Sequence, residues 1–186
     1  MLFVNEIEGL REAYERFVQL PWDRSLAGPE KVWFAIYDPA QERRLRLRIP
    51  EFERATGNAG HTWVHLDLTN LFAQWMTEHP YRDAYFEEPE DMELALQDFA
   101  TFVARQITDL LTSSDTAVDT VVALSGLASL FGLVSASAIF ETVTSAIRGR
   151  LLVFFPGQHN GSHYRLLDAR DGWNYLAVPI TAVEGK

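Results

Sequence analysis

The sequence predicts an α/β protein with a single-domain Rossmann-like three-layer fold, in which a mainly parallel five-stranded sheet carries helices on both faces. Short apolar runs begin near residues 31, 62, 119, 151 and 175, and helical patterns separate the first four. The length of 186 residues, 47% of them hydrophobic and 23% charged, suits one globular domain. We expect that domain to span residues 1–186, with an N-terminal helix at 5–19 and a core at 31–180.

The first strand and the helix after it follow from local patterns. Lys31–Tyr37 (KVWFAIY) is a predicted strand that ends at Asp38. Residues 41–58 have a helical pattern, and we expect Pro50 to break it, since proline fits the first turn of a new helix.

Four arginines crowd the start of this helical region. Two interpretations are open. The arginines form a solvated helix face, which is the usual role of a run of charges, or they form a docking patch for an acidic partner or a nucleic-acid backbone. The candidate patch consists of Arg43, Arg44, Arg46 and Arg48.

The middle of the chain should supply a strand and two helices. His61–Leu68 (HTWVHLDL) is a predicted strand, in which His65 is more typical of a hydrogen-bonded structural residue than of a metal ligand. A short helix capped by Thr69 and Asn70 follows. The acidic segment after it lacks the spacing of a calcium loop, so we interpret it as the acidic start of a long helix from about Pro89 to Leu111.

Residues 118–157, which carry no charge from Thr120 to Phe140, are the centre of the predicted fold. They are expected to form a strand at Val121–Leu124, a turn, a helix at Leu127–Ile147 and a buried strand at Leu151–Phe155. A membrane span is the alternative, but its flanks are acidic and its middle is rich in serine and glycine. A last strand is predicted at Asn174–Ile180.

A strand order of 2-1-3-4-5 would place the ligand-binding crevice where the first and third strands end. Turn residues at those ends, with one arginine from the following loop, form the predicted ligand or partner edge: Asp38, Ser125, Gly126, Pro156, Gly157 and Arg165. Ser125 is either a serine nucleophile on a strand-to-helix turn or, more simply, a helix cap, since its surroundings lack the G-x-S-x-G pattern.

Several classes of function lose support from the composition. The net charge of −10 disfavours nucleic-acid binding by the general field of the protein, and the lack of cysteine excludes thiolate chemistry. The chain has no P-loop, no dinucleotide-binding glycine motif and no catalytic set, and the spacing of His159 and His163 does not fit a zinc helix. We therefore expect no cofactor, no metal and no membrane segment, and a cytoplasmic location.

One set of motifs resembles a known family. The run Leu152-Val153-Phe154-Phe155-Pro156-Gly157, followed by Tyr164-Arg165-Leu166-Leu167, is similar to the C-terminal half of BrxB, a component of the bacteriophage-exclusion (BREX) defence systems. Four shorter motifs extend the resemblance over most of the chain from Val32 to Ile180: Tyr37-Asp38-Pro39, Leu66-Asp67-Leu68, Ser125-Gly126 before a helix, and Asn174-Tyr175. The resemblance implies a small cytoplasmic α/β protein without known catalysis that acts with a PglZ-like phosphatase-superfamily protein and other BREX components.

Two functions from different classes follow. The first is a non-catalytic assembly subunit of a BREX-type system that binds a PglZ-like partner through the arginine patch or the loop at 158–173. The second is a small-ligand or nucleotide-sensing domain, with or without weak hydrolytic activity, that uses the crevice at Asp38, Ser125 and Gly157.

Overall fold

The computed structural model describes residues 6–182, and it is an α/β structure built on one mixed sheet. The predicted helix start at residue 5 and the chain end after 182 lie outside the described residues. The strands are β1 (Val32–Tyr37), β2 (Thr62–Asp67), β3 (Thr120–Ser125), β4 (Arg150–Asn160), β5 (His163–Leu166), β6 (Trp173–Asn174) and β7 (Val178–Ile180). The α-helices are α1 (Glu6–Val18), α2 (Glu42–Asn58), α3 (Leu71–Glu78), α4 (Arg82–Glu87), α5 (Leu96–Thr112) and α6 (Ala136–Val143).

The strand order is β2-β3-β4-β1-β7, and all four pairs along this path are parallel. Two antiparallel pairs, β4 with β5 and β5 with β6, extend it to seven strands, so the sheet is mixed and not the mainly parallel five-stranded sheet that the sequence predicts. The predicted order 2-1-3-4-5 is also wrong, because β4 lies between β1 and β3. The expected parallel crossover from β3 to β4 is confirmed.

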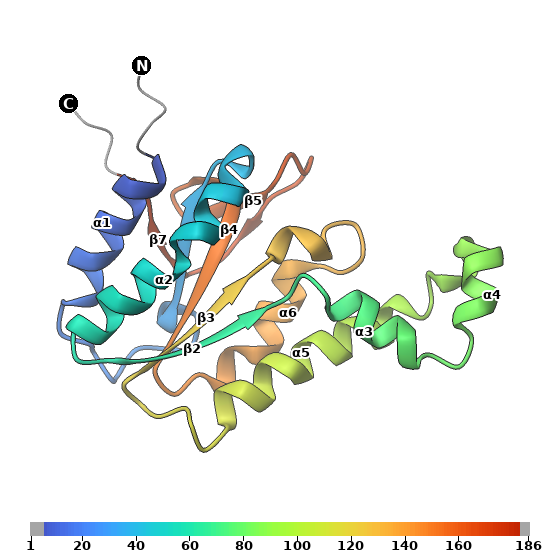
Figure 1. The fold of residues 1–186 in the computed structure, drawn as a ribbon, viewed down its shortest axis with the longest axis horizontal. Coiled ribbons are helices and arrows are strands. Elements are labelled where there is room, and N and C mark those ends of the chain that lie inside the picture. The colour runs from blue at the N-terminus through green and yellow to red at the C-terminus, as the bar shows by residue number, and fades with distance from the viewer. Residues whose placement is uncertain (1–5, 183–186) are drawn as a thin grey trace.

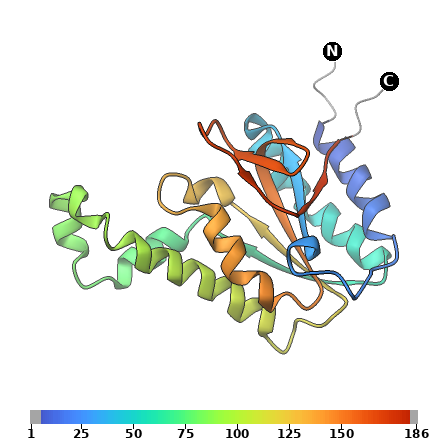
Figure 2. The same ribbon diagram turned by 180° about the vertical axis from the view of Figure 1, so that it is seen from behind.

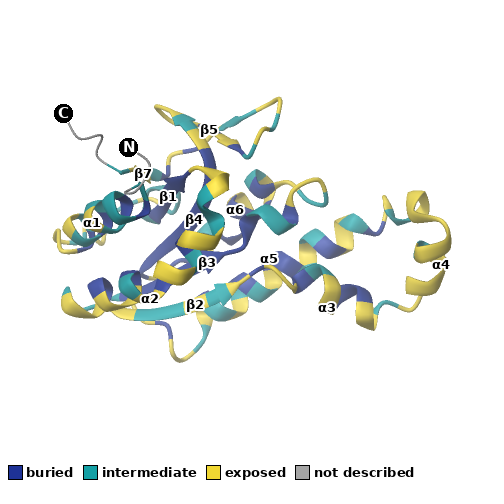
Figure 3. Ribbon diagram, turned by 45° about the horizontal axis from the view of Figure 1, so that its top comes forward, coloured by how far each residue is buried: buried dark blue, intermediate teal, exposed yellow. Residues whose placement is uncertain are grey.

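Helices cover both faces of the sheet, each over its own apolar core (Figures 1 and 2). Side chains of a strand alternate between faces, so neighbouring residues of β1 enter different cores: Trp33 packs with α1 and α2, and Phe34 with α5 and α6. The three central strands β1, β3 and β4 are buried over residues 32–37, 120–125 and 150–157, whereas the edge strand β2 is half exposed (Figure 3). The face of β2 on which α2 packs is therefore partly exposed to solvent.

Several predicted element boundaries are wrong. Pro50 lies inside the continuous helix α2, on its exposed face, where water can solvate the carbonyl group that lacks a helical partner. The predicted helix at 89–111 begins only at Leu96, because a separate helix α4 and a 3₁₀ turn at Pro89–Met92 precede it. The expected helix at Leu127–Ile147 is divided by Gly132, which has a φ of +77°.

The predicted turn at Pro156-Gly157 is also wrong. Strand β4 continues to Asn160 and returns through β5, and the Leu167 N–H donates to the Pro156 carbonyl oxygen at 2.8 Å. Tyr164 on β5 then packs edge-on against Phe34 with ring centroids 4.7 Å apart, and its hydroxyl donates to the Ala177 carbonyl oxygen. This hairpin is fixed to the main core through a buried aromatic ring.

The stretch that has a membrane span as its alternative forms β3, a 3₁₀ turn and the first part of α6. Within residues 6–182, no helix combines the length and the apolar character needed to cross a bilayer.

Candidate functional site

The carboxyl edge of the sheet brings together only part of the predicted ligand or partner edge. Parallel pairing places the ends of β1, β3 and β4 at one edge, and Tyr37 pairs with Pro156. Asp38 and Ser125 nevertheless belong to strands that are not neighbours, because β4 runs between them. Ser125 instead pairs with Asp67 at the end of β2.

Asp38 has a local structural role. Its carboxylate accepts a hydrogen bond from the Ala40 N–H at 2.9 Å and so caps the short 3₁₀ helix at Pro39–Gln41. The backbone N–H of Asp38 donates to Glu6 Oε1 at 2.9 Å. Both contacts hold the chain where it leaves β1.

Pro156 and Gly157 are covered by the β4–β5 hairpin. Gly157 pairs with Leu166 across the β4–β5 hairpin, so β5 occupies the space beside the expected crevice. The side chain of Arg165, on the same hairpin, is exposed. The six predicted residues thus divide between the end of β1, the hairpin and the β2–β3 edge.

Ser125 is 1% exposed, and its hydroxyl group hydrogen-bonds to His65 Nε2 at 2.8 Å. Contrary to the prediction, the serine does not cap the following 3₁₀ helix, because Gly126 occupies the cap position. The contact confirms that His65 is hydrogen-bonded, and burial lowers the pKa of its imidazole. A serine oxygen this deeply buried is not placed to attack a substrate, so the pair serves to join β2 to β3.

A polar cluster that the sequence did not predict surrounds this point, and we call it the edge cluster: Tyr37, Glu42, Arg46, Asp67 and Thr69. The Arg46 guanidinium bridges α2 to the end of β2, with hydrogen bonds to Glu42 at 2.9 Å, to Asp67 at 3.0 Å and to Thr69 at 2.6 Å. Tyr37 donates to Glu42, and the Thr69 hydroxyl donates to Asp67. The L-D-L motif at Leu66–Leu68 marks this position in the sequence, but its distant partner Arg46 is visible only in the fold.

Electrostatics in the edge cluster follow from these contacts. Burial raises the pKa of the Asp67 carboxyl group, but the hydrogen bonds from Thr69 and the charge of Arg46 outweigh it, so the pKa lies below its usual value. Burial, together with the hydrogen bond to Glu42, raises the pKa of the Tyr37 hydroxyl group. Asp67 is thus held as an anion beside Arg46.

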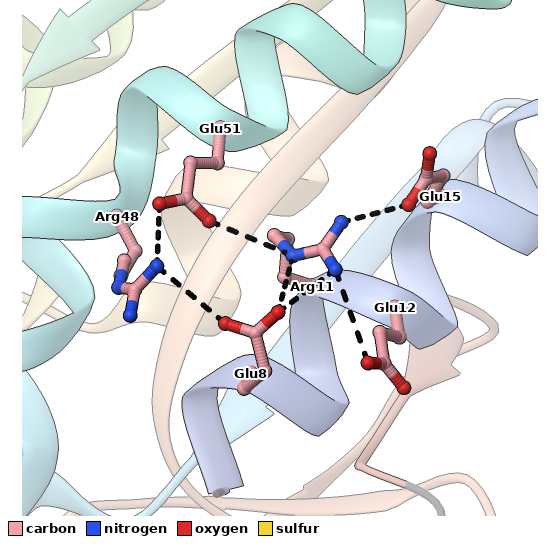
Figure 4. A network of polar contacts seen from close by, with 6 residues as sticks. All are labelled: Glu8, Arg11, Glu12, Glu15, Arg48 and Glu51. Atoms are coloured by element: carbon pink, nitrogen blue, oxygen red, sulfur yellow. Dashed lines mark hydrogen bonds and ion pairs between the residues drawn. The ribbon is translucent and has the colours of Figure 1, made fainter.

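The predicted arginine patch does not form one surface. Residues two apart on a helix differ by about 200° around its axis, so Arg46 and Arg48 point to opposite sides of α2. Arg48 bonds to Glu51 at 2.5 Å and lies 3.5 Å from Glu8 of α1. There it joins a network around Arg11 that fastens α1 to α2 (Figure 4). Arg43 and Arg44 are exposed at the start of the helix.

A second surface that the sequence did not single out is the arm, residues 79–95, which contains α4 and projects away from the sheet (Figures 1 and 2). Its tip is almost entirely exposed (Figure 3). Three large apolar side chains of the arm stand in solvent: Tyr81 is 66%, Phe86 70% and Leu94 83% exposed. Six exposed carboxylates lie among them: Asp83, Glu87, Glu88, Glu90, Asp91 and Glu93.

Comparison with known proteins adds nothing to this geometry, because no family model, no curated protein and no solved structure matches the chain. Among the described residues, no group of three or more histidine, aspartate or glutamate side chains is arranged to hold a metal ion.

Proposed function

We propose that this protein is an assembly subunit that binds a partner protein through the arm. The observation that carries the proposal is the exposure of Tyr81, Phe86 and Leu94 on a segment that projects from the sheet. An apolar side chain that leaves water contributes roughly 1.5–3 kcal/mol, so three exposed apolar side chains on one short projecting segment favour a binding role over a purely structural one.

The charge of the arm defines the kind of partner. The arm contains a single Lys or Arg side chain, Arg82, against six exposed carboxylates. Arg82 lies 3.3 Å from Asp83 and donates to the Thr77 carbonyl oxygen. A surface of this kind is complementary to an apolar groove with a basic rim. The carboxylates would steer the encounter, and the aromatic side chains would fill the groove.

The resemblance to the BrxB family supplies the biological setting. On that basis we propose that the partner is the PglZ-like protein of a BREX-type phage-defence system, that binding takes place in the cytoplasm, and that the subunit contributes no chemistry of its own. The arginine patch is the less suitable docking surface, because Arg46 and Arg48 are engaged in ion pairs within the chain.

A co-elution experiment tests both parts of the proposal. The purified protein, mixed at tens of micromolar with the PglZ-like protein of the same system, should elute as a complex. Phe86→Ser and Leu94→Ser should each weaken binding at least tenfold, since residues that anchor an interface contribute about 2 kcal/mol or more. Leu47→Ser is the matched control, because Leu47 is 80% exposed but lies on α2.

Each contrary result contradicts a defined part. Separate elution of the two wild-type proteins would remove the PglZ-like partner. Binding that survives both arm substitutions but is lost in Leu47→Ser or Arg43→Glu would move the interface to α2. A dimer of the protein alone that Leu94→Ser dissociates would identify a second copy of this chain as the occupant of the arm.

A further inference from the structure

A basic pocket lies at the opposite end of the sheet from the edge cluster, where the parallel strands begin. We call it the amino-edge pocket. It has a volume of about 380 Å³ and is lined by residues that precede or open the strands: Trp22, Arg24, Lys31, His61, Val118, Asp119, Arg148 and Arg150. Sequence patterns did not reveal it, because its cations come from two distant segments, one before β1 and one at the start of β4, that meet only when these two strands pair.

The charge of the pocket is opposite to that of the protein. Four basic side chains and one carboxylate, that of Asp119, line it, in a chain with a net charge of −10. Among the described residues, none of the four cations forms an ion pair with a carboxylate within 4.0 Å. Arg24 is exposed and makes no hydrogen bond with the described residues. Lys31 donates to the Ile147 carbonyl oxygen at 3.5 Å, and Arg148 donates to backbone oxygens at the end of α5 and in the turn after it.

Arg150 makes the strongest case for a missing anion. It is 4% exposed, and a buried guanidinium without a carboxylate in direct contact is costly. Of its five N–H donors, the described residues accept two, through the carbonyl oxygens of Gly149 at 3.0 Å and Asp23 at 2.8 Å. Its charge also lies over the Trp22 ring, 4.8 Å from the centroid. Burial lowers the pKa of this guanidinium, and the nearby Asp23 carboxylate offsets the effect only in part.

Two ring nitrogens in the pocket wall lack partners as well. Trp22 and His61 stack with centroids 3.7 Å apart and an angle of 7° between the rings. Trp22 Nε1 and His61 Nδ1 are both buried without a hydrogen-bond partner among the described residues. Buried polar atoms of this kind are rare in folded proteins, and a bound ion or water is one explanation for them.

We propose that the amino-edge pocket binds the phosphate group of a small phosphorylated molecule. A phosphate dianion matches several cations that form no ion pair with the described residues, and its oxygens can accept two parallel hydrogen bonds from one guanidinium. The volume is within the range of small-molecule sites, which leaves room for an organic portion beside the phosphate. This site is independent of partner binding by the arm.

Isothermal titration with inorganic phosphate, pyrophosphate and ATP tests the site and identifies the source of the phosphate. We expect binding of at least one of them, strengthened at low salt and accompanied by a change in tryptophan fluorescence from Trp22. Arg24→Gln and Lys31→Gln should each weaken that binding about three- to tenfold, an estimate for partly solvated charged contacts. Arg43→Gln is the matched control, because Arg43 is equally an exposed arginine but belongs to α2 at the other end of the sheet.

Three results would overturn the proposal. The first is no binding of any of the three probes at millimolar concentration. The second is binding that survives both pocket substitutions or falls equally in Arg43→Gln. The third is a single-stranded oligonucleotide that binds this surface more tightly than all three probes, which would assign the pocket to a nucleic-acid backbone.

Discussion

Replacing Gly126 by alanine should destabilise the fold through the edge cluster. Gly126 has a φ of +76°, and a Cβ atom there would lie 2.5 Å from Thr69 Oγ1, 2.6 Å from Asp67 Oδ1 and 2.9 Å from the Thr69 backbone nitrogen. The left-handed conformation costs alanine about 1–2 kcal/mol. The overlap adds about 1–3 kcal/mol, because the backbone nitrogen of Thr69 cannot move away by a side-chain rotation.

Gly132 provides the matched control for this substitution. Its φ of +77° is nearly identical, but a Cβ atom added there would meet no other atom within 4 Å, so Gly132→Ala carries only the backbone cost. Urea unfolding followed by circular dichroism should therefore show Gly126→Ala less stable than Gly132→Ala by about 1–3 kcal/mol. Equal free energies of unfolding for the two variants would refute the close packing of Gly126 against Asp67 and Thr69.

Three further predictions use the same unfolding assay. Asp67→Asn should be less stable than wild type at neutral pH. Because the pKa of Asp67 is lowered in the folded state, this difference in stability should shrink as the pH falls below about 4. A difference that does not change with pH would contradict the ion pair with Arg46. Ser125→Ala should cost about 0.5–1.5 kcal/mol through the lost hydrogen bond to His65, and no loss would exclude that bond. Arg148→Gln should cost about 0.5–1.5 kcal/mol, because the end of α5 and the turn after it lose an exposed charged donor to three carbonyl oxygens; an unchanged free energy of unfolding would show that water replaces it.

Local patterns sufficed for most strands and for the layers. The apolar runs at residues 31–37 and 151–155 are long and uncharged after Lys31, which is typical of strands buried on both faces, and both are central in the sheet. Local patterns do not predict the strand order. The helical connection at residues 41–58 allows β2 to pair directly with β1 or to lie several strands away from it in the same sheet. The connection from β1 through α2 to β2 carries the chain past the positions of β4 and β3, and no residue pattern within it indicates this distance.

The candidate site was harder to predict than the fold. Gly126 and Asp67 were each visible as turn or motif residues, but the prediction joined Ser125 to Asp38 because it assumed that their strands are neighbours. The arm was hidden for a different reason. Its acidic residues matched the expected start of a helix, and nothing in the spacing of Phe86 and Leu94 distinguishes a solvent-exposed apolar side chain from a buried one.

The distribution of charge explains why the two proposed surfaces lie away from the usual crevice. In parallel sheets, ligands commonly bind at the carboxyl ends of the strands. Here the β4–β5 hairpin covers that end beside Gly157, and Arg46 pairs with Asp67 at the end of β2 and with Glu42 of α2. Charge without a counter-ion is found instead at the amino edge around Arg150 and on the arm. A binding partner can still stabilise charge without an ion pair and exposed apolar area. The basic amino-edge pocket therefore suits an anionic ligand, and the acidic arm suits a partner with a basic surface.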